Sequence, residues 1–156
     1  MRRVAMKVVL LALAVAMMGA VAAWAGGGHH GKGSGRALTV IEHATTDATT
    51  DTGAPGDTAG DILTFANQVF DRSDAHAVGT DQGYCIRTVA GKSYECNWTT
   101  ILDGGQITVE GPFLDAGDST LAVTGGTGRY RHARGFMKLH PLAGGTKFRF
   151  EFHLRG

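Results

Sequence analysis

The stretch "KFRFEFHLR", Lys147–Arg155, alternates apolar and polar side chains over its whole length. The apolar set consists of Phe148, Phe150, Phe152 and Leu154. Successive side chains of an extended strand point to opposite faces, so a period of two is typical of a strand that is buried on one face only. The chain is therefore predicted to end in a half-buried antiparallel β-strand.

Similar short segments precede this strand and are separated by glycine-containing turns. We expect further strands at residues 37–43, 61–71, 83–89, 94–102, 105–111, 119–125 and 129–139. Residues 44–60 are polar and of low complexity, and we expect a long loop there. No convincing helical periodicity follows the first 25 residues. The pattern predicts an all-β barrel or sandwich, and closure into a barrel would remove exposed strand edges and leave a mouth for one small ligand.

The glycine-rich stretch "VTGGTGRYRHARG", Val123–Gly135, raises the question of a phosphate-binding loop. Such loops join a strand to a helix, and the Walker form also needs a lysine after its last glycine. Here no such lysine is present, and the residues that follow are strand-like. We therefore expect Gly125, Gly126 and Gly128 to supply positive φ angles in a hairpin turn.

The first 25 residues are typical of a secretory signal peptide. "MRRVAMK" is positively charged, an apolar run follows it, and "AWA" at Ala23–Ala25 fits a cleavage site. We predict cleavage after Ala25 and secretion of the mature protein, with no stable membrane insertion; the alternative is an uncleaved membrane anchor. Residues 26–36 are expected to form a flexible spacer rich in glycine and histidine, and residues 37–156 the barrel domain.

The charge of the chain and its motifs argue against several classes of partner and site. The mature chain would carry 12 basic and 14 acidic residues without a basic stripe, which argues against a nucleic-acid partner. Arg129, Arg131 and Arg134 form only a local cluster; with His132, Arg134 could bind a substrate carboxylate or lie on a solvated outer face. No hydrolase signature and no set of metal ligands is recognisable, so neither a nucleophile nor a metal site is predicted.

The two cysteines, Cys85 and Cys96, flank the hairpin "CIRTVAGKSYEC". Counting inward from both ends places Cys85 opposite Cys96 and Ile86 opposite Glu95. A loop at residues 89–92 would make the cysteines a non-hydrogen-bonded pair, whose close Cβ atoms suit a disulfide. We predict this disulfide, which an exported protein can keep; the alternative is a free Cys85 thiol.

Several blocks in order give the chain a family resemblance. "GDILTFANQVFD", "VGTDQGYCIRT", "GGQITVEGPFLDAGDSTLAVTGGTGRYRHARGFMKL" and "KFRFEFHL" resemble the allene oxide cyclase barrel, whose superfamily includes the dirigent proteins. The resemblance runs from about Leu38 to Leu154. It implies an eight-stranded antiparallel β-barrel, trimeric in the plant members, that steers a lipophilic substrate to one stereochemical outcome without a metal or organic cofactor.

The resemblance also assigns residues to a pocket. It implies that Glu42 polarises the substrate, that Asn67 is a hydrogen-bonding partner and that Cys85 constrains the substrate chain. Plant cyclases have an asparagine two residues after the glutamate, where Ala44 stands here, so we expect a different apolar substrate. From the residues alone, Glu42 could instead face water, and Asn67 could be satisfied by backbone rather than face a cavity.

Aromatic side chains complete the expected pocket. We expect Phe65, Trp98, Phe113 and Tyr130 to line it with Cys85, although such residues are often plain core. The first hypothesis is an exported protein that binds a lipophilic small molecule and promotes its stereoselective cyclisation or isomerisation, with Glu42 and Asn67 as its catalytic residues. The alternatives are a dirigent-type steering or lipophile-binding protein and a structural module without a ligand.

Overall fold

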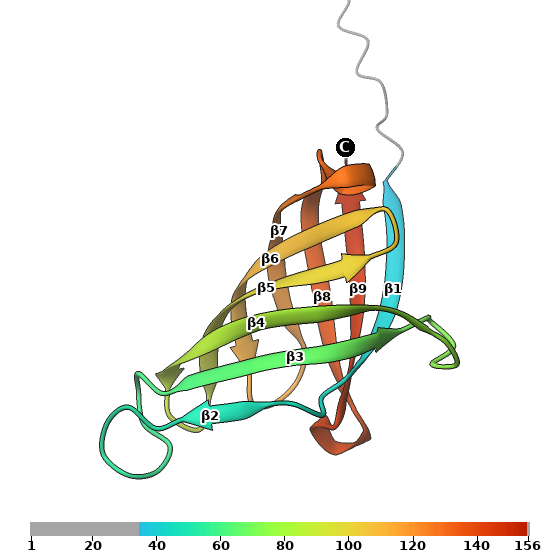
Figure 1. The fold of residues 1–156 in the computed structure, drawn as a ribbon. Helices are drawn as coiled ribbons and strands as arrows, with labels where there is room; N and C mark the ends of the chain where they lie inside the picture. Colours follow the sequence, from blue (N-terminus) through green and yellow to red (C-terminus); the bar gives the residue numbers. More distant parts are fainter. Residues whose placement is uncertain (1–34, 156) are drawn as a thin grey trace, which may run out of the picture. The chain divides into compact units, whose positions relative to one another are not determined.

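A computed structural model describes residues 35–155. The expected signal peptide at 1–25 and nearly all of the expected spacer at 26–36 lie outside the described residues. Figure 1 shows the fold. The strands are β1 (Arg36–His43), β2 (Ala48–Thr50), β3 (Ile62–Phe70), β4 (Ala77–Val89), β5 (Ser93–Leu102), β6 (Gly105–Leu114), β7 (Ser119–Gly126), β8 (Arg134–Leu142) and β9 (Lys147–Arg155), with 3₁₀ helices η1 (Gly128–Tyr130) and η2 (Ala143–Gly145).

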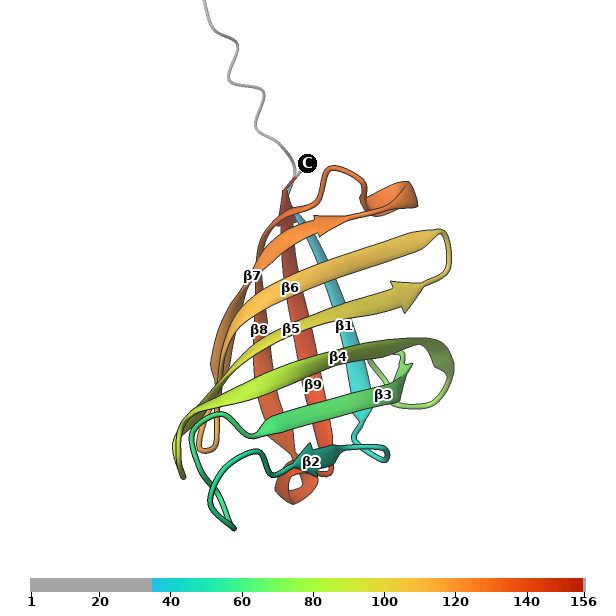
Figure 2. The same cartoon turned by 60° about the vertical axis from the view of Figure 1, so that its left-hand side comes forward.

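The strands form one closed antiparallel barrel. Their order is β1-β9-β8-β7-β6-β5-β4-β3-β2, and β1 returns to pair with β3 (Figures 1 and 2). Eight strands make the closed ring, and the short β2 is an extra strand that pairs with β3 alone in the described part of the chain. The predicted all-β, eight-stranded antiparallel barrel is confirmed.

The C-terminal strand β9 lies between β1 and β8 and supplies much of the core. Phe150 pairs with Val40 on one side and Leu139 on the other, and all three side chains are buried. The apolar positions of β9 are buried in alternation along the strand, as its sequence period predicts. Each such side chain stabilises the fold by roughly 1.5–3 kcal/mol.

Three segments differ from the sequence prediction. β2 lies inside the expected loop. The sequence did not predict this strand, because its exposed residues show no alternation of apolar and polar side chains. β4 begins at Ala77, six residues before the predicted start at residue 83. The sequence pattern did not reveal this first part, because its inward positions carry glycine and an aspartate instead of apolar side chains. The strand expected at 129–139 begins only at Arg134, after the turn that contains η1.

The glycine-rich stretch forms a turn, but only one of its three glycines has the expected backbone conformation. Gly128 has a φ of 56°, whereas Gly125 and Gly126 are the last residues of β7. Gly126 is needed for a different reason: a Cβ atom there would collide with the carbonyl oxygens of Gln106 and Tyr130. The loop leads through a single 3₁₀ turn into β8.

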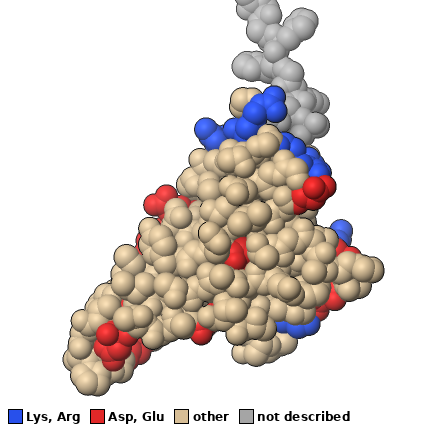
Figure 3. Space-filling model, in the orientation of Figure 1, with Lys and Arg blue, Asp and Glu red and all other residues tan. Residues whose placement is uncertain are grey.

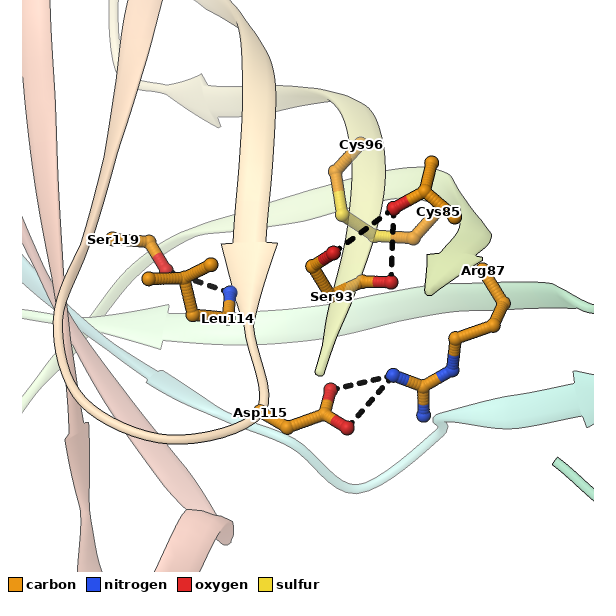
Figure 4. Close-up of a disulfide and its surroundings, with 8 residues drawn as sticks. Cys85, Arg87, Ser93, Cys96, Leu114, Asp115 and Ser119 are labelled. Atoms are coloured by element: carbon orange, nitrogen blue, oxygen red, sulfur yellow. Dashed lines mark hydrogen bonds and ion pairs between the residues drawn. A yellow bond between two sulfur atoms is a disulfide. The ribbon is translucent and has the colours of Figure 1, made fainter. Parts of the chain in front are cut away.

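The predicted disulfide is confirmed, although the hairpin loop comprises residues 90–92 and not 89–92, because Val89 belongs to β4 and pairs with Ser93. Cys85 pairs with Cys96 and Ile86 with Glu95, and the two cysteine Cα atoms are 4.0 Å apart. Figure 4 shows the bridge beside Arg87, whose Nη1 donates to both carboxylate oxygens of Asp115.

Reduction of this disulfide is expected to lower the free energy of unfolding by about 3 kcal/mol, because it frees a loop of eleven-residue separation in the unfolded chain. Denaturant unfolding with and without dithiothreitol measures this difference. The double variant Cys85→Ala/Cys96→Ala serves as the control, because its stability should not respond to dithiothreitol. Equal stability of the oxidised and reduced wild-type chain would contradict the expectation.

Candidate functional site

The hydrogen-bond ladder along β3 is interrupted where β1 ends and β2 has not yet begun. β1 pairs with β3 at residues 68–70, and β2 pairs with it at residues 62–64. Between them, residues 44–47 leave the ladder. Asn67 of β3 spans this gap: its Oδ1 accepts hydrogen bonds from the backbone N–H groups of Thr45 and Thr46 and from the Thr46 hydroxyl, each at 3.0 Å.

The amide nitrogen of Asn67 faces the barrel's acidic groups. Nδ2 donates to Glu42 Oε1 at 2.7 Å and to Asp47 Oδ1 at 2.8 Å. Oδ1 and both hydrogens of Nδ2 therefore have hydrogen-bond partners. Exchanging the oxygen and nitrogen would place Nδ2 against the N–H donors of Thr45 and Thr46, so the amide orientation is fixed. Only 1% of the Asn67 side chain is exposed. Asn67 thus satisfies backbone groups and holds Glu42 at the same time.

Asp81 of β4 completes the acidic group. It lies directly across the β3–β4 ladder from Asn67 and is completely buried. Neither of its oxygens has a hydrogen-bond partner in the described residues, and the negative charge of the nearby Glu42 acts on it. Two neighbouring buried carboxyl groups favour the state in which one of them is protonated.

Burial raises the pKa of both Glu42 and Asp81, and the pKa of Asp81 becomes the higher of the two. Desolvation, and then the negative charge of Glu42, raise the pKa of Asp81 to about 9. Desolvation also raises the pKa of Glu42, to about 7, against the lowering effect of the Asn67 hydrogen bond. At neutral pH, Asp81 is therefore protonated, and Glu42 can either accept or release a proton.

The protonated Asp81 makes stability depend on pH. An aspartate in an unfolded chain ionises near pH 4, so unfolding releases a proton between about pH 4 and pH 9, and rising pH favours the unfolded state in that range. We expect Asp81→Asn to be more stable than wild type at pH 8 by roughly 1–4 kcal/mol, since the buried amide stays neutral and has no proton to lose on unfolding.

Thermal unfolding from pH 5 to pH 9 measures this dependence. The wild type should lose stability as pH rises, and Asp81→Asn should lose less. Asp103→Asn, which changes an exposed aspartate, should keep the wild-type slope. A slope unchanged in Asp81→Asn would show that Asp81 is ionised in the folded protein.

A small cavity lies beside these acids. Its volume is about 50 Å³, and it is lined by Glu42, Asp47, Leu63, Phe65, Cys85, Cys96, Trp98, Phe113, Leu139, Phe148 and Phe150. None of the Lys, Arg or His side chains between positions 35 and 155 lines it. Pockets for drug-sized ligands usually measure about 300–1,000 Å³. A ligand of that size would have to displace the half-buried side chains of the lining, which are Leu63, Phe65 and Phe113.

The structure brings most of the sequence-predicted site residues together. Phe65, Cys85, Trp98 and Phe113 line the cavity with Glu42, while Asn67 lies one hydrogen bond behind Glu42. The Cys85 sulfur is bonded to Cys96, so it forms part of the wall and cannot act as a nucleophile.

Tyr130 is the exception. It lies in η1, beneath the guanidinium of Arg36 at the start of β1, and it does not line this cavity. Glu42 is six residues further along β1, about 20 Å away by the rise of a strand.

Sequence reasoning missed Asp47 and Asp81. Asp81 is in phase with Cys85 on β4, and this spacing of four residues was the available signal that both point inward. Asp47 lies in a segment without periodicity, so only the folded chain could place it.

No group of three or more His, Cys, Asp or Glu side chains between positions 35 and 155 is arranged to hold a metal ion. None of the helices in this same range is long and apolar enough to cross a membrane.

Comparison with known proteins places the fold. The sequence profile of the allene oxide cyclase family matches residues 40–156. A pyocyanin demethylase structure is 28% identical, with a TM-score of 0.68, and the match covers 76% of this chain and 99% of that one. A pterocarpan synthase dirigent protein is 15% identical (TM-score 0.62; 78% and 97% covered). An exo-specific intermolecular Diels–Alderase is 16% identical (TM-score 0.64; 80% and 100% covered). The last two likenesses concern the fold alone.

Proposed function

Because the chain belongs to the allene oxide cyclase family, we propose that it is an exported barrel protein that binds a lipophilic small molecule and promotes its stereoselective cyclisation or isomerisation. The observation that carries this proposal is the Glu42–Asp81 carboxyl pair at one side of an apolar, aromatic cavity. The pair supplies a proton-transfer group near neutral pH, and the cavity supplies a shape that restrains a flexible substrate.

In this proposal the chemistry is proton transfer without a covalent intermediate. The Glu42 carboxylate accepts a proton from the substrate, and the same proton returns at another atom, so that an isomer results. Asn67 fixes the Glu42 carboxyl through its Nδ2 hydrogen bond. A positioned acid or base contributes about 10²–10⁴-fold to a rate. Restricting the substrate to one reactive conformer contributes further.

The electrostatics of the cavity favour neutral or cationic substrates. Glu42 and Asp47 line it, and none of the described residues in its lining is basic and could balance an anion. A substrate carboxylate placed here would meet like charges in a poorly solvated site, which disfavours binding. We therefore expect an uncharged or cationic lipophile as substrate.

The Cys85–Cys96 disulfide supports the proposed export. Disulfides form and persist in oxidising compartments such as the periplasm and the extracellular space, and they are rare in the cytosol.

The second candidate is a dirigent-type protein that steers reactive species made by another enzyme. The likeness to a dirigent protein over 78% of the chain favours keeping it. Such a protein uses the same cavity but produces nothing unless an oxidase generates its radicals or quinone methides.

One experiment separates the two candidates. Full-length protein is incubated with neutral unsaturated epoxides and with phenolic precursors, with and without a one-electron oxidase, and the enantiomers are resolved by chiral chromatography. The proposal expects an enantiomeric excess without the oxidase, and a weaker effect on carboxylate analogues. An excess only with the oxidase would establish the dirigent-type function, and racemic products throughout would contradict both.

A further inference from the structure

The end of the barrel where β1 begins and β9 ends is strongly basic. Five arginines gather there, among the eleven Lys and Arg residues between positions 35 and 155, and Figure 3 shows this blue end. They are Arg36, Arg129, Arg131, Arg134 and Arg155. They come from β1, from the turn containing η1, from β8 and from β9.

None of these five arginines forms an ion pair with a carboxylate of the described residues, whereas Arg87, Lys147 and Arg149 do. The 34 residues that precede the described part contain no Asp or Glu that could neutralise them.

Four of the arginines surround a hollow of about 210 Å³. Arg36, Arg129, Arg131 and Arg155 line it together with Tyr130 and His132. The remaining lining comes from Ala133 and Leu154 and contains no acidic side chain. The hollow is therefore a concave site bordered by guanidinium groups from three separate segments of the chain.

The guanidinium groups are held by contacts within the protein. The buried Tyr130 ring lies 5.8 Å from the Arg36 guanidinium carbon and 5.4 Å from that of Arg129. Arg129 Nη1 also donates to the Asp103 carbonyl, and Arg131 Nε donates to His132 Nε2. Restraining long side chains in this way lowers the entropy lost when a ligand binds.

We propose that this hollow binds the phosphate group of a ligand, at a site separate from the acidic cavity. Guanidinium groups match the oxygen geometry of phosphate and remain charged at every physiological pH. Several uncompensated arginines around one hollow can donate to several oxygens of one phosphate group, whereas a carboxylate offers only two. The phosphate can belong to a free small molecule or to a lipid headgroup, and the test distinguishes these sources.

The test uses the full chain, with inorganic pyrophosphate followed by calorimetry and with phosphatidylglycerol vesicles followed by co-sedimentation against phosphatidylcholine vesicles. We expect binding that weakens as salt rises. Arg131→Gln alone and Arg129→Gln/Arg131→Gln together should weaken it at least tenfold. Lys92→Gln removes the same charge from an exposed turn elsewhere, and binding should stay within about twofold of wild type.

The results of this test separate a free phosphate ligand from a lipid headgroup and from the absence of a phosphate site. Salt-sensitive pyrophosphate binding that the arginine variants lose supports a free phosphate ligand, and binding to phosphatidylglycerol vesicles alone supports a lipid headgroup. Absence of both in the wild type overturns the proposal. So does an equal loss in Lys92→Gln and in the arginine variants, because that result would reflect net charge only. Thermal unfolding of each variant confirms that it is folded.

Discussion

Replacing Asn67 with alanine is expected to lower the free energy of unfolding by about 3–5 kcal/mol, the range for removing one partner from a buried charged network. The substitution removes all five hydrogen bonds of the side chain at once. The gap between β1 and β2 would lose its link to β3, and Glu42 and Asp47 would lose their shared donor.

Chemical denaturation at pH 7 measures this loss. The matched control is Asn97→Ala, because Asn97 is the other asparagine of the chain and its side chain makes no hydrogen bond within the described residues. The control should change stability by less than about 1 kcal/mol. Equal effects of the two substitutions would show that the ladder gap does not depend on Asn67. Asn67→Asp should be at least as damaging, because it adds a fourth ionisable carboxyl group to Glu42, Asp47 and Asp81.

Glu42→Gln is expected to lower kcat/KM for the proposed reaction by about 10²–10⁴-fold while the fold is retained. Gln has nearly the same shape as Glu, and its Oε1 can still accept the Asn67 hydrogen bond. It cannot take up a proton, so the proposed transfer stops. Because burial raises the pKa of Glu42 to about 7, wild-type kcat/KM should rise with pH through that value when Glu42 acts as the base.

The controls for this variant separate catalysis from packing. Glu110→Gln changes an exposed glutamate of β6 and should leave kcat/KM unchanged. Thermal unfolding should show Glu42→Gln to be as stable as the wild type or more so, because a buried ionisable group is lost. Full activity in Glu42→Gln would remove Glu42 from the mechanism, whereas unfolding of that variant would identify its role as structural.

Local patterns in the sequence predicted most of the fold. The alternation in β9 and the mirrored spacing of Cys85 and Cys96 each depend on one strand or one hairpin, where neighbouring residues fix which face a side chain takes. β2 and the first half of β4 could not be predicted in this way. Their residues are polar or glycine, so burial leaves no pattern in the sequence, and only pairing with other strands makes them extended.

The sequence by itself predicted an all-β fold with a disulfide-bonded hairpin, and its family resemblance predicted an eight-stranded barrel with Glu42 and Asn67 at the pocket. Only the tertiary structure decided that Asn67 bridges Glu42 and Asp47 and that Asp81 is buried across the ladder from Asn67. It alone also gathered arginines from β1, the η1 turn and β9 at one end. The physical reason is that pKa values and charge clusters depend on desolvation and on distances between residues far apart in the chain. Closure of the barrel fixes the desolvation and these distances, and the alternation of residues within one strand does not predict either of them.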